Sequence, residues 1–141
     1  ATDLLAEAKL SPELRNEALY YRAKAYTKQK ADKKAVDDLR ELAKDTRNAY
    51  GAEAKYLVAQ SLYDAKEYNA AEKELLNYIE QSTPHAYWLA RSFVLLSDVY
   101  AAMGKDLDAR QYLLSLQQNY QGNDDIATMI ESRLSKLKVK N

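Results

Sequence analysis

Ala52–Pro84 reads AEAKYLVAQSLYDAKEYNAAEKELLNYIEQSTP and predicts two short amphipathic helices joined by a tight turn. In each half the apolar residues recur every three or four positions, which places one apolar stripe along each helix. The stripes are formed by Ala54, Val58, Leu62, Ala71, Leu75, Tyr78 and Ile79. Because Lys66–Asn69 is long enough only to reverse the chain, we expect antiparallel helices, with Asn69 as the N-cap of the second.

The same pattern occurs in both neighbouring stretches, at offsets of 36 and 38 residues. At five positions small residues stay small and large apolar residues stay large. The three sets are Ala23, Tyr26, Ala35, Leu39 and Leu42; Ala59, Leu62, Ala71, Leu75 and Tyr78; and Ser97, Tyr100, Ala109, Leu113 and Leu116. A small residue on one helix lets a bulky side chain of the other approach its backbone. A period of this length is typical of a helical solenoid.

The pattern resembles the tetratricopeptide repeat, whose consensus places Trp, Leu, Gly and Tyr on the first helix, then Ala, a bulky residue, Ala and a closing Pro. The third copy follows this order with Phe93, Leu96, Ser97, Tyr100, Gly104, Ala109 and Leu113. The second copy has Lys55 in place of Trp, and its closing Pro is displaced to Pro84. The match covers Asn16–Gln121. It implies an all-α fold, a right-handed α-α superhelix of about three helix pairs plus a C-terminal capping helix.

We interpret residues 1–141 as a single domain of this kind. Its expected parts are a remnant of a preceding repeat (1–10), repeat 1 (16–51), repeat 2 (52–89), repeat 3 (90–121) and the capping helix (123–137). Since the chain opens with Ala1 and its first ten residues resemble only the second helix of a repeat, we interpret it as a fragment of a longer solenoid.

Local signals predict the helix ends. Ser11-Pro12 should start a helix that reaches Lys28, and Thr83-Pro84 should start one that reaches Met103. The second helix of the first pair should end near Asp45. Gly104 should supply the left-handed residue that stops the third pair's first helix.

Composition restricts the possible functions. The chain has 21 basic and 21 acidic residues, so no net charge attracts nucleic acid or an anionic membrane. No stretch approaches the roughly 18 apolar residues of a membrane span. With no cysteine, one histidine (His85) and no glycine-rich phosphate loop, the common nucleophile, zinc and nucleotide motifs are absent. We therefore expect no enzymatic activity, no cofactor and no metal.

A basic run, RAKAYTKQKADKK, occupies Arg22–Lys34. One interpretation is a nucleic-acid patch, which predicts salt-dependent binding. The favoured interpretation is a solvated face balanced by acids of the next helix, because the basic residues surround the turn instead of lining one stripe. Those acids are Asp37, Asp38, Glu41 and Asp45.

The chain has twelve tyrosines against one Phe and one Trp. On a groove face a tyrosine offers contact area together with a hydroxyl, and the alternative interpretation of these rings is an ordinary wet surface or packing against missing repeats. Tyr26 and Tyr100 fall at core positions. In the resembling family the concave face binds extended or helical peptides. That face would comprise Glu17, Tyr20, Lys24, Lys28, Glu53, Tyr56, Gln60, Tyr63, Arg91, Val94 and Asp98. The expected binding residues are Tyr20, Lys24, Tyr56, Gln60, Tyr63, Arg91 and Asp98.

We expect a non-catalytic scaffold that binds a peptide or partner protein on its concave face. The alternative is a structural spacer, or a segment that self-associates through the solenoid ends. A chaperone adaptor is not expected, because the Asn positions of the family's carboxylate clamp hold Lys24 and Leu57. The stretch TPHAYWLARSFVLLSDVY (Thr83–Tyr100) is similar to envelope-associated tetratricopeptide proteins of Gram-negative bacteria, which implies a periplasmic location.

Overall fold

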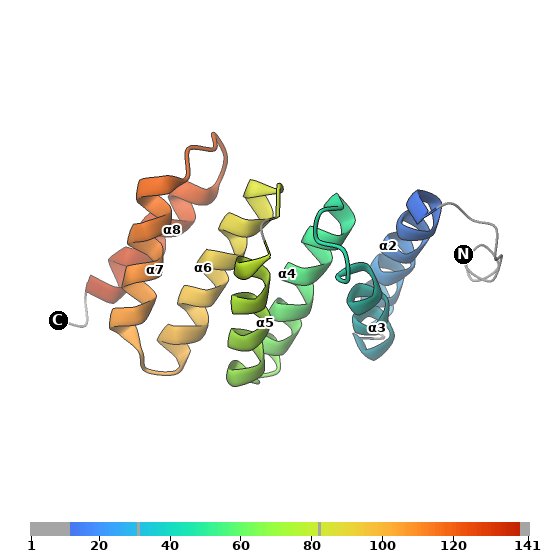
Figure 1. The fold of residues 1–141 in the computed structure, drawn as a ribbon. Helices are drawn as coiled ribbons and strands as arrows, with labels where there is room; N and C mark the ends of the chain where they lie inside the picture. The colour runs from blue at the N-terminus through green and yellow to red at the C-terminus, as the bar shows by residue number, and fades with distance from the viewer. Residues whose placement is uncertain (1–11, 31, 82, 139–141) are drawn as a thin grey trace.

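The computed structural model describes residues 12–30, 32–81 and 83–138. Within these ranges the chain forms seven helices and no strand, which confirms the all-α class (Figure 1). The helices are α2 (Pro12–Lys28), α3 (Asp32–Leu42), α4 (Ala49–Asp64), α5 (Tyr68–Glu80), α6 (Ala86–Ala102), α7 (Asp106–Asn119) and α8 (Ile126–Lys138). The expected repeat remnant at residues 1–10 and the expected cap at Ser11 lie outside the described residues.

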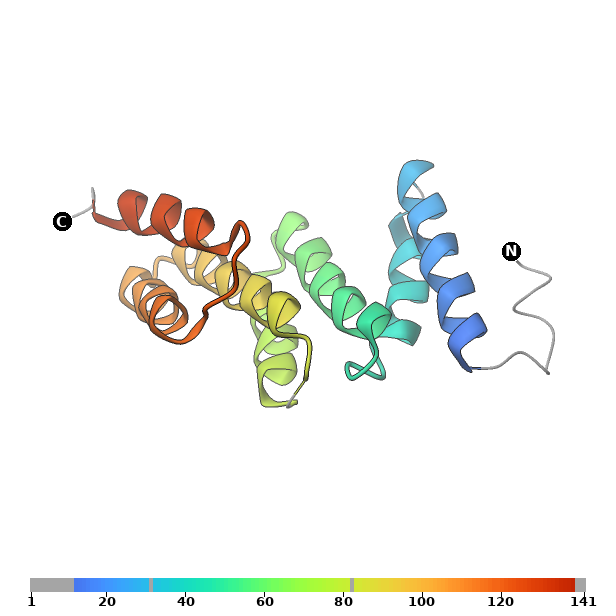
Figure 2. The same cartoon turned by 90° about the horizontal axis from the view of Figure 1, so that it is seen from above.

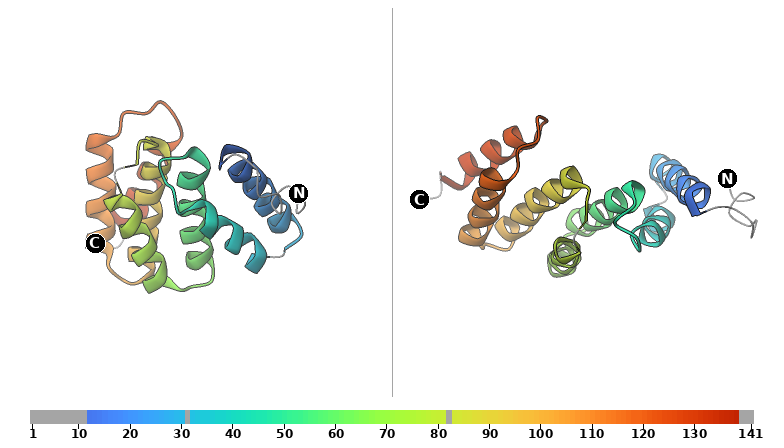
Figure 3. Two further views of the ribbon diagram at one scale, coloured as in Figure 1. Left: turned by 45° about the vertical axis from the view of Figure 1, so that its right-hand side comes forward. Right: turned by 45° about the horizontal axis from the view of Figure 1, so that its top comes forward.

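The helices are arranged as successive pairs. α2 packs on α3, α4 on α5 and α6 on α7, and α8 packs against α6 and α7 (Figures 1 and 3). In the described part of the chain α4 contacts both α2 and α6, whereas α3, α5 and α7 do not contact one another. We call α2, α4, α6 and α8 the inner row, and α3, α5 and α7 the outer row (Figure 2). Each outer helix also packs on the inner helix of the next pair, α3 on α4 and α5 on α6.

The turns inside the three pairs have equivalent backbone conformations. Lys30, Lys66 and Gly104 adopt positive φ angles of 60°, 63° and 77°, at the offsets of 36 and 38 that the sequence shows. The residues before the last two, Ala65 and Met103, also match, with φ/ψ of −81°/3° and −85°/3°. The expected left-handed stop at Gly104 is confirmed, and lysine fills the same position in the other two pairs.

Burial follows the predicted periodicity. Every residue of the three repeated sets is buried except Tyr26 and Leu62, which are half-buried. The second-helix residues include Leu75, Tyr78 and Leu113, which are almost completely inaccessible. Tyr100 lies in the core as expected, whereas Tyr26 is only partly covered.

The core is divided into two clusters. The larger one runs from α4 to α8. The smaller one holds α2 and α3 against α4 and consists of Leu19, Ala23, Leu39, Leu42, Ala43, Ala54 and Val58. Leu57 and Leu62 of α4 pack against both clusters. The first helix pair is therefore joined to the rest mainly through α4.

Some helix ends differ from their expected positions. α4 begins at Ala49, three residues early, because the Asn48 Oδ1 atom accepts hydrogen bonds from the backbone N–H groups of Tyr50 and Gly51 at 2.8 and 3.4 Å. The expected N-cap at Asn69 is wrong. Asn69 lies inside α5, whose cap position is Glu67. α3 ends at Leu42, before the expected Asp45.

Candidate functional site

The seven expected binding residues all lie on the inner row, in α2, α4 and α6. The structure brings most of them together in contacts between neighbouring helices. These contacts form three groups, which join α2 to α4, α4 to α6, and α6 to α8.

The first group joins α2 to α4. The Tyr20 hydroxyl donates a hydrogen bond to Glu53 Oε2 at 3.2 Å, and Lys24 Nζ lies 3.1 Å from the same oxygen. Burial, followed by the charge of Glu53, raises the pKa of Tyr20. The polar groups of two expected binding residues, Tyr20 and Lys24, are therefore already paired with Glu53 of the same chain.

The second group centres on Arg91 of α6. Its guanidinium donates to the hydroxyl of Tyr56 at 2.9 Å and to that of Tyr87 at 3.0 Å. The Tyr56 hydroxyl donates in turn to Gln60 Oε1 at 3.0 Å, and the Tyr87 hydroxyl to Asp125 Oδ1 at 3.0 Å. These bonds connect α4, α6 and the segment before α8.

Tyr56 is only 6% exposed. The Arg91 guanidinium carbon lies 4.8 Å from its ring centroid, and the Trp88 ring centroid lies 5.6 Å away. This placement corrects the expectation that Tyr56 presents its ring on the concave surface. Arg91 and Trp88 cover it.

The third group joins α6 to α8. Asp98 accepts two hydrogen bonds from Arg133, from Nε at 2.8 Å and from Nη2 at 3.1 Å. A cavity of about 610 Å³ lies beside this pair. It is lined by Tyr63, Ser97, Asp98, Ala101, Ser132, Arg133, Lys136 and Leu137. We call it the concave cavity, since its lining comes from α4, α6 and α8 of the inner row.

The concave cavity retains unused hydrogen-bond donors. Burial, followed by the charge of Asp98, raises the pKa of Tyr63, so its hydroxyl is protonated at neutral pH. No hydrogen bond to the Tyr63 hydroxyl and no ion pair to Lys136 occurs among the described residues. A hydroxyl and an ammonium group can together hold a carboxylate or a peptide carbonyl.

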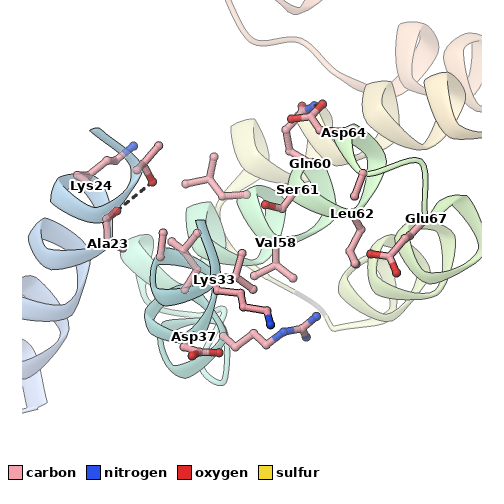
Figure 4. A pocket seen from close by; sticks show the side chains of 17 residues that line it. Ala23, Lys24, Lys33, Asp37, Val58, Gln60, Ser61, Leu62, Asp64 and Glu67 are labelled. Carbon is pink, nitrogen blue, oxygen red and sulfur yellow. Dashed lines mark hydrogen bonds between the residues drawn. The ribbon is translucent and has the colours of Figure 1, made fainter. Parts of the chain in front are cut away.

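A second cavity, of about 730 Å³, lies between the first two helix pairs and is lined by residues of both (Figure 4). Lys24 and Gln60 are the two expected binding residues that line it, whereas Tyr20, Tyr56 and Arg91 line neither cavity. Arg133 and Lys136 were missed by the sequence reasoning, because α8 lies outside the repeat register. Their only sequence signal is a separation of three residues on one helix.

The basic run is partly neutralised by acidic side chains of α3 and α4. Arg22 donates two hydrogen bonds to the buried carboxylate of Asp38, at 2.8 and 2.6 Å. Lys24 is paired with Glu53 at 3.1 Å. The charged groups of Arg22 and Lys24 therefore have acidic partners inside the chain, one of them from the acids of the next helix.

In the described ranges no group of three or more His, Cys, Asp or Glu side chains is placed to hold a metal ion. Nor does any described helix have the length and apolar character needed to cross a membrane. In comparisons with known proteins, no family model and no curated protein matches this chain.

Proposed function

We propose that this chain is a non-catalytic scaffold of the tetratricopeptide type that binds a peptide or a segment of a partner protein on its concave face. The three helix pairs with equivalent turns at Lys30, Lys66 and Gly104 support the repeat assignment. The concave cavity carries the binding proposal, because it combines accessible volume with the donors of Tyr63 and Lys136.

The cavity walls favour an acidic or carbonyl-bearing ligand. Arg133 is held by Asp98, so this pair forms a fixed wall with little net charge. Lys136 adds one positive charge without a counter-ion in the described part of the chain. A carboxylate side chain, or the carboxylate at a peptide's end, would pair with Lys136 and accept a hydrogen bond from Tyr63.

A photo-crosslinking residue at Tyr63 tests this proposal, with cell lysate and membrane extracts as the source of partners. The matched control places the same residue at Leu107, which is 72% exposed on the outer row. We expect one dominant adduct from position 63, weakened by Lys136→Glu and absent from position 107. Equal labelling from both positions would contradict binding at the concave cavity.

A second candidate function is a spacer or self-associating segment of a longer solenoid. It is favoured by large apolar side chains exposed near both ends of the stack, Leu14 and Tyr21 on α2 and Leu107 and Leu114 on α7. Sedimentation velocity over a wide concentration range tests it. Self-association that Tyr21→Ser and Leu107→Ser each weaken would favour this function, and a concentration-independent monomer would oppose it.

A further inference from the structure

The cavity between the α2/α3 pair and the α4/α5 pair is lined by buried apolar side chains and by residues next to the turns inside the two pairs (Figure 4). We call it the inter-pair cleft. Its floor is formed by Ala23, Ala35, Leu39, Val58 and Leu62. It is lined by Ala23, Leu39 and Val58 of the smaller cluster, at the junction where α2 and α3 pack on α4.

The repeat explains why this cleft is open. At the next junction, between α4/α5 and α6/α7, larger apolar side chains occupy several of the equivalent positions at offsets of 36 and 38, while Asn69 and Ala102 stand there in place of the charged Lys33 and Asp64. Thr27, Ser61, Leu62 and Ala65 in the first junction correspond to Tyr63, Val99, Tyr100 and Met103 in the second. Val99 is completely buried and Tyr100 is 7% exposed, whereas Ser61 and Leu62 are only half-buried.

The difference lies in side-chain volume and not in the turn conformation. Ala65 and Met103 have nearly identical backbone angles, and the left-handed residues that follow them, Lys66 and Gly104, also agree. The first junction therefore lacks the apolar volume that its own repeat supplies at the second. Such a space can be filled by apolar side chains of another molecule.

The two walls of the cleft carry charges of opposite sign. On the α2/α3 wall the basic residues Lys24, Lys33 and Arg40 outnumber the single acid Asp37, and on the opposite wall Asp64 and Glu67 are acidic. Lys24 is paired with Glu53 at 3.1 Å, and Arg40 lies 3.9 Å from Glu74. Lys33 and Glu67 have no ion-pair partner among the described residues, and both side chains are exposed.

We propose that the inter-pair cleft is a docking site for an amphipathic helical segment of a partner protein. This segment inserts bulky apolar side chains into the cleft lined by α2, α3 and α4. It carries acidic residues on the flank that faces Lys33 and basic residues on the flank that faces Glu67. The apolar stripe supplies the missing volume, and the charged flanks fix the direction in which the segment lies. The site is separate from the concave cavity at Tyr63 and Lys136 and does not depend on it.

The test uses a synthetic amphipathic peptide of about four helical turns, with a Phe/Leu stripe, Glu on one flank and Lys on the other. Two matched peptides have the flanks exchanged or the stripe changed to Ala. We expect the first peptide to shift the backbone amide signals of Ser61 and Leu62 in NMR spectra. We expect both matched peptides to bind at least about tenfold more weakly.

Two variants of the protein check the site. Ser61→Val with Ala65→Met installs the side chains of the second junction and should weaken peptide binding at least about tenfold. Lys33→Glu with Glu67→Lys changes only exposed side chains and should reverse the preference between the two flank orders. Lys136→Glu in the concave cavity should leave peptide binding unchanged.

The proposal is overturned if the peptide shifts no amide signal near Ser61, or if the charge-exchanged variant keeps the original preference. Shifts confined to Tyr63 and Lys136 would also overturn it and would assign the peptide to the concave cavity. Failure of this test leaves the crosslinking result at Tyr63 unaffected, so the two proposals are judged separately.

Discussion

Gly51 shows how one residue fixes the approach of two helices. It is buried in α4, and a Cβ atom at this position would overlap the backbone of Asp45 and the carbonyl oxygen of Leu42 at the end of α3. Replacing a helical glycine by alanine ordinarily gains up to about 1 kcal/mol. Here we expect Gly51→Ala to lower the free energy of unfolding by about 1–3 kcal/mol, because the first helix pair must move.

Urea denaturation monitored by circular dichroism measures this loss. Ala70→Gly, at an exposed position of α5, serves as the control for helix propensity alone. A Gly51→Ala protein more stable than the wild type would contradict the close contact between α3 and α4.

The three left-handed turn residues allow a matched pair of substitutions. Lys66 has a φ angle of 63° and Gly104 one of 77°, at equivalent positions of successive pairs. The left-handed conformation costs a non-glycine residue about 1–2 kcal/mol. We expect Gly104→Ala to lower the melting temperature and Lys66→Gly to leave it unchanged or raise it. The opposite order in a thermal scan would show that the lysine side chain stabilises its turn.

At the scale of elements, a largely buried ion pair joins α2 to α3. Arg22 donates two hydrogen bonds to Asp38, whose side chain is only 6% exposed. We expect Arg22→Met to lower the free energy of unfolding by about 3 kcal/mol, because the Asp38 carboxylate is left buried without its partner. Chemical denaturation measures the effect.

Two controls separate charge from packing. The pair of Lys44 with Glu41 is exposed, so Lys44→Met should cost less than about 1 kcal/mol. The double variant Arg22→Met with Asp38→Leu should recover most of the stability lost by Arg22→Met. If the double variant is as unstable as the single one, the loss comes from packing.

The helices were predictable from the sequence, and their ends less so. Periodicity located every described pair, since the spacing of residues such as Ala71 and Leu75 already contains the geometry of a helix. Caps depend on which local side chain reaches the free N–H groups. Asn48 makes this contact for α4, whereas Asn69 makes no such contact for α5. Both are asparagines near a helix start, and composition alone does not distinguish them.

The candidate site was less predictable than the fold. The repeat register placed Tyr20, Tyr56 and Tyr63 on the inner row. It could not show that Arg91, 35 positions after Tyr56, covers that ring and bonds its hydroxyl. Tyr63 lines a cavity because α8 stands beside it, and α8 follows no repeat register. Contacts between helices of different pairs decide which of the three tyrosines remains accessible.

At the scale of the whole molecule, the tyrosines set the response to high pH. Burial raises the pKa of Tyr78 and Tyr100, and the hydrogen bond to Asp124 raises the pKa of Tyr120 to about 12. Tyrosines of the unfolded chain ionise near pH 10. The stability that the three folded tyrosines contribute is therefore fully present below pH 10 and is lost as the pH rises toward their raised pKa values in the folded protein. We expect the free energy of unfolding to fall above about pH 10.

Denaturation curves collected at successive pH values measure this fall. Tyr120→Phe removes one of the shifted groups, so its free energy of unfolding should fall less steeply between about pH 10 and 12. An identical slope for both proteins would contradict the bond between Tyr120 and Asp124.

The division of the core predicts that the molecule does not open as one unit. The smaller cluster holds α2 and α3 against α4, and the inter-pair cleft removes packing at that junction. The larger cluster runs from α4 to α8 and includes the fully buried Leu96 and Val99 of α6. Regions with fewer buried contacts open at a lower free energy than the global unfolding reaction.

Native-state hydrogen exchange tests this prediction. We expect the slowest amides of α2 and α3 to exchange at least about tenfold faster than those of α6, a difference of about 1.4 kcal/mol in opening free energy. Ser61→Val with Ala65→Met fills the junction and should reduce the difference, whereas Lys136→Glu, at the far end of the stack, should not. Equal protection in α2 and α6 of the unaltered protein would show that the two clusters unfold together, and that the cleft does not weaken the junction.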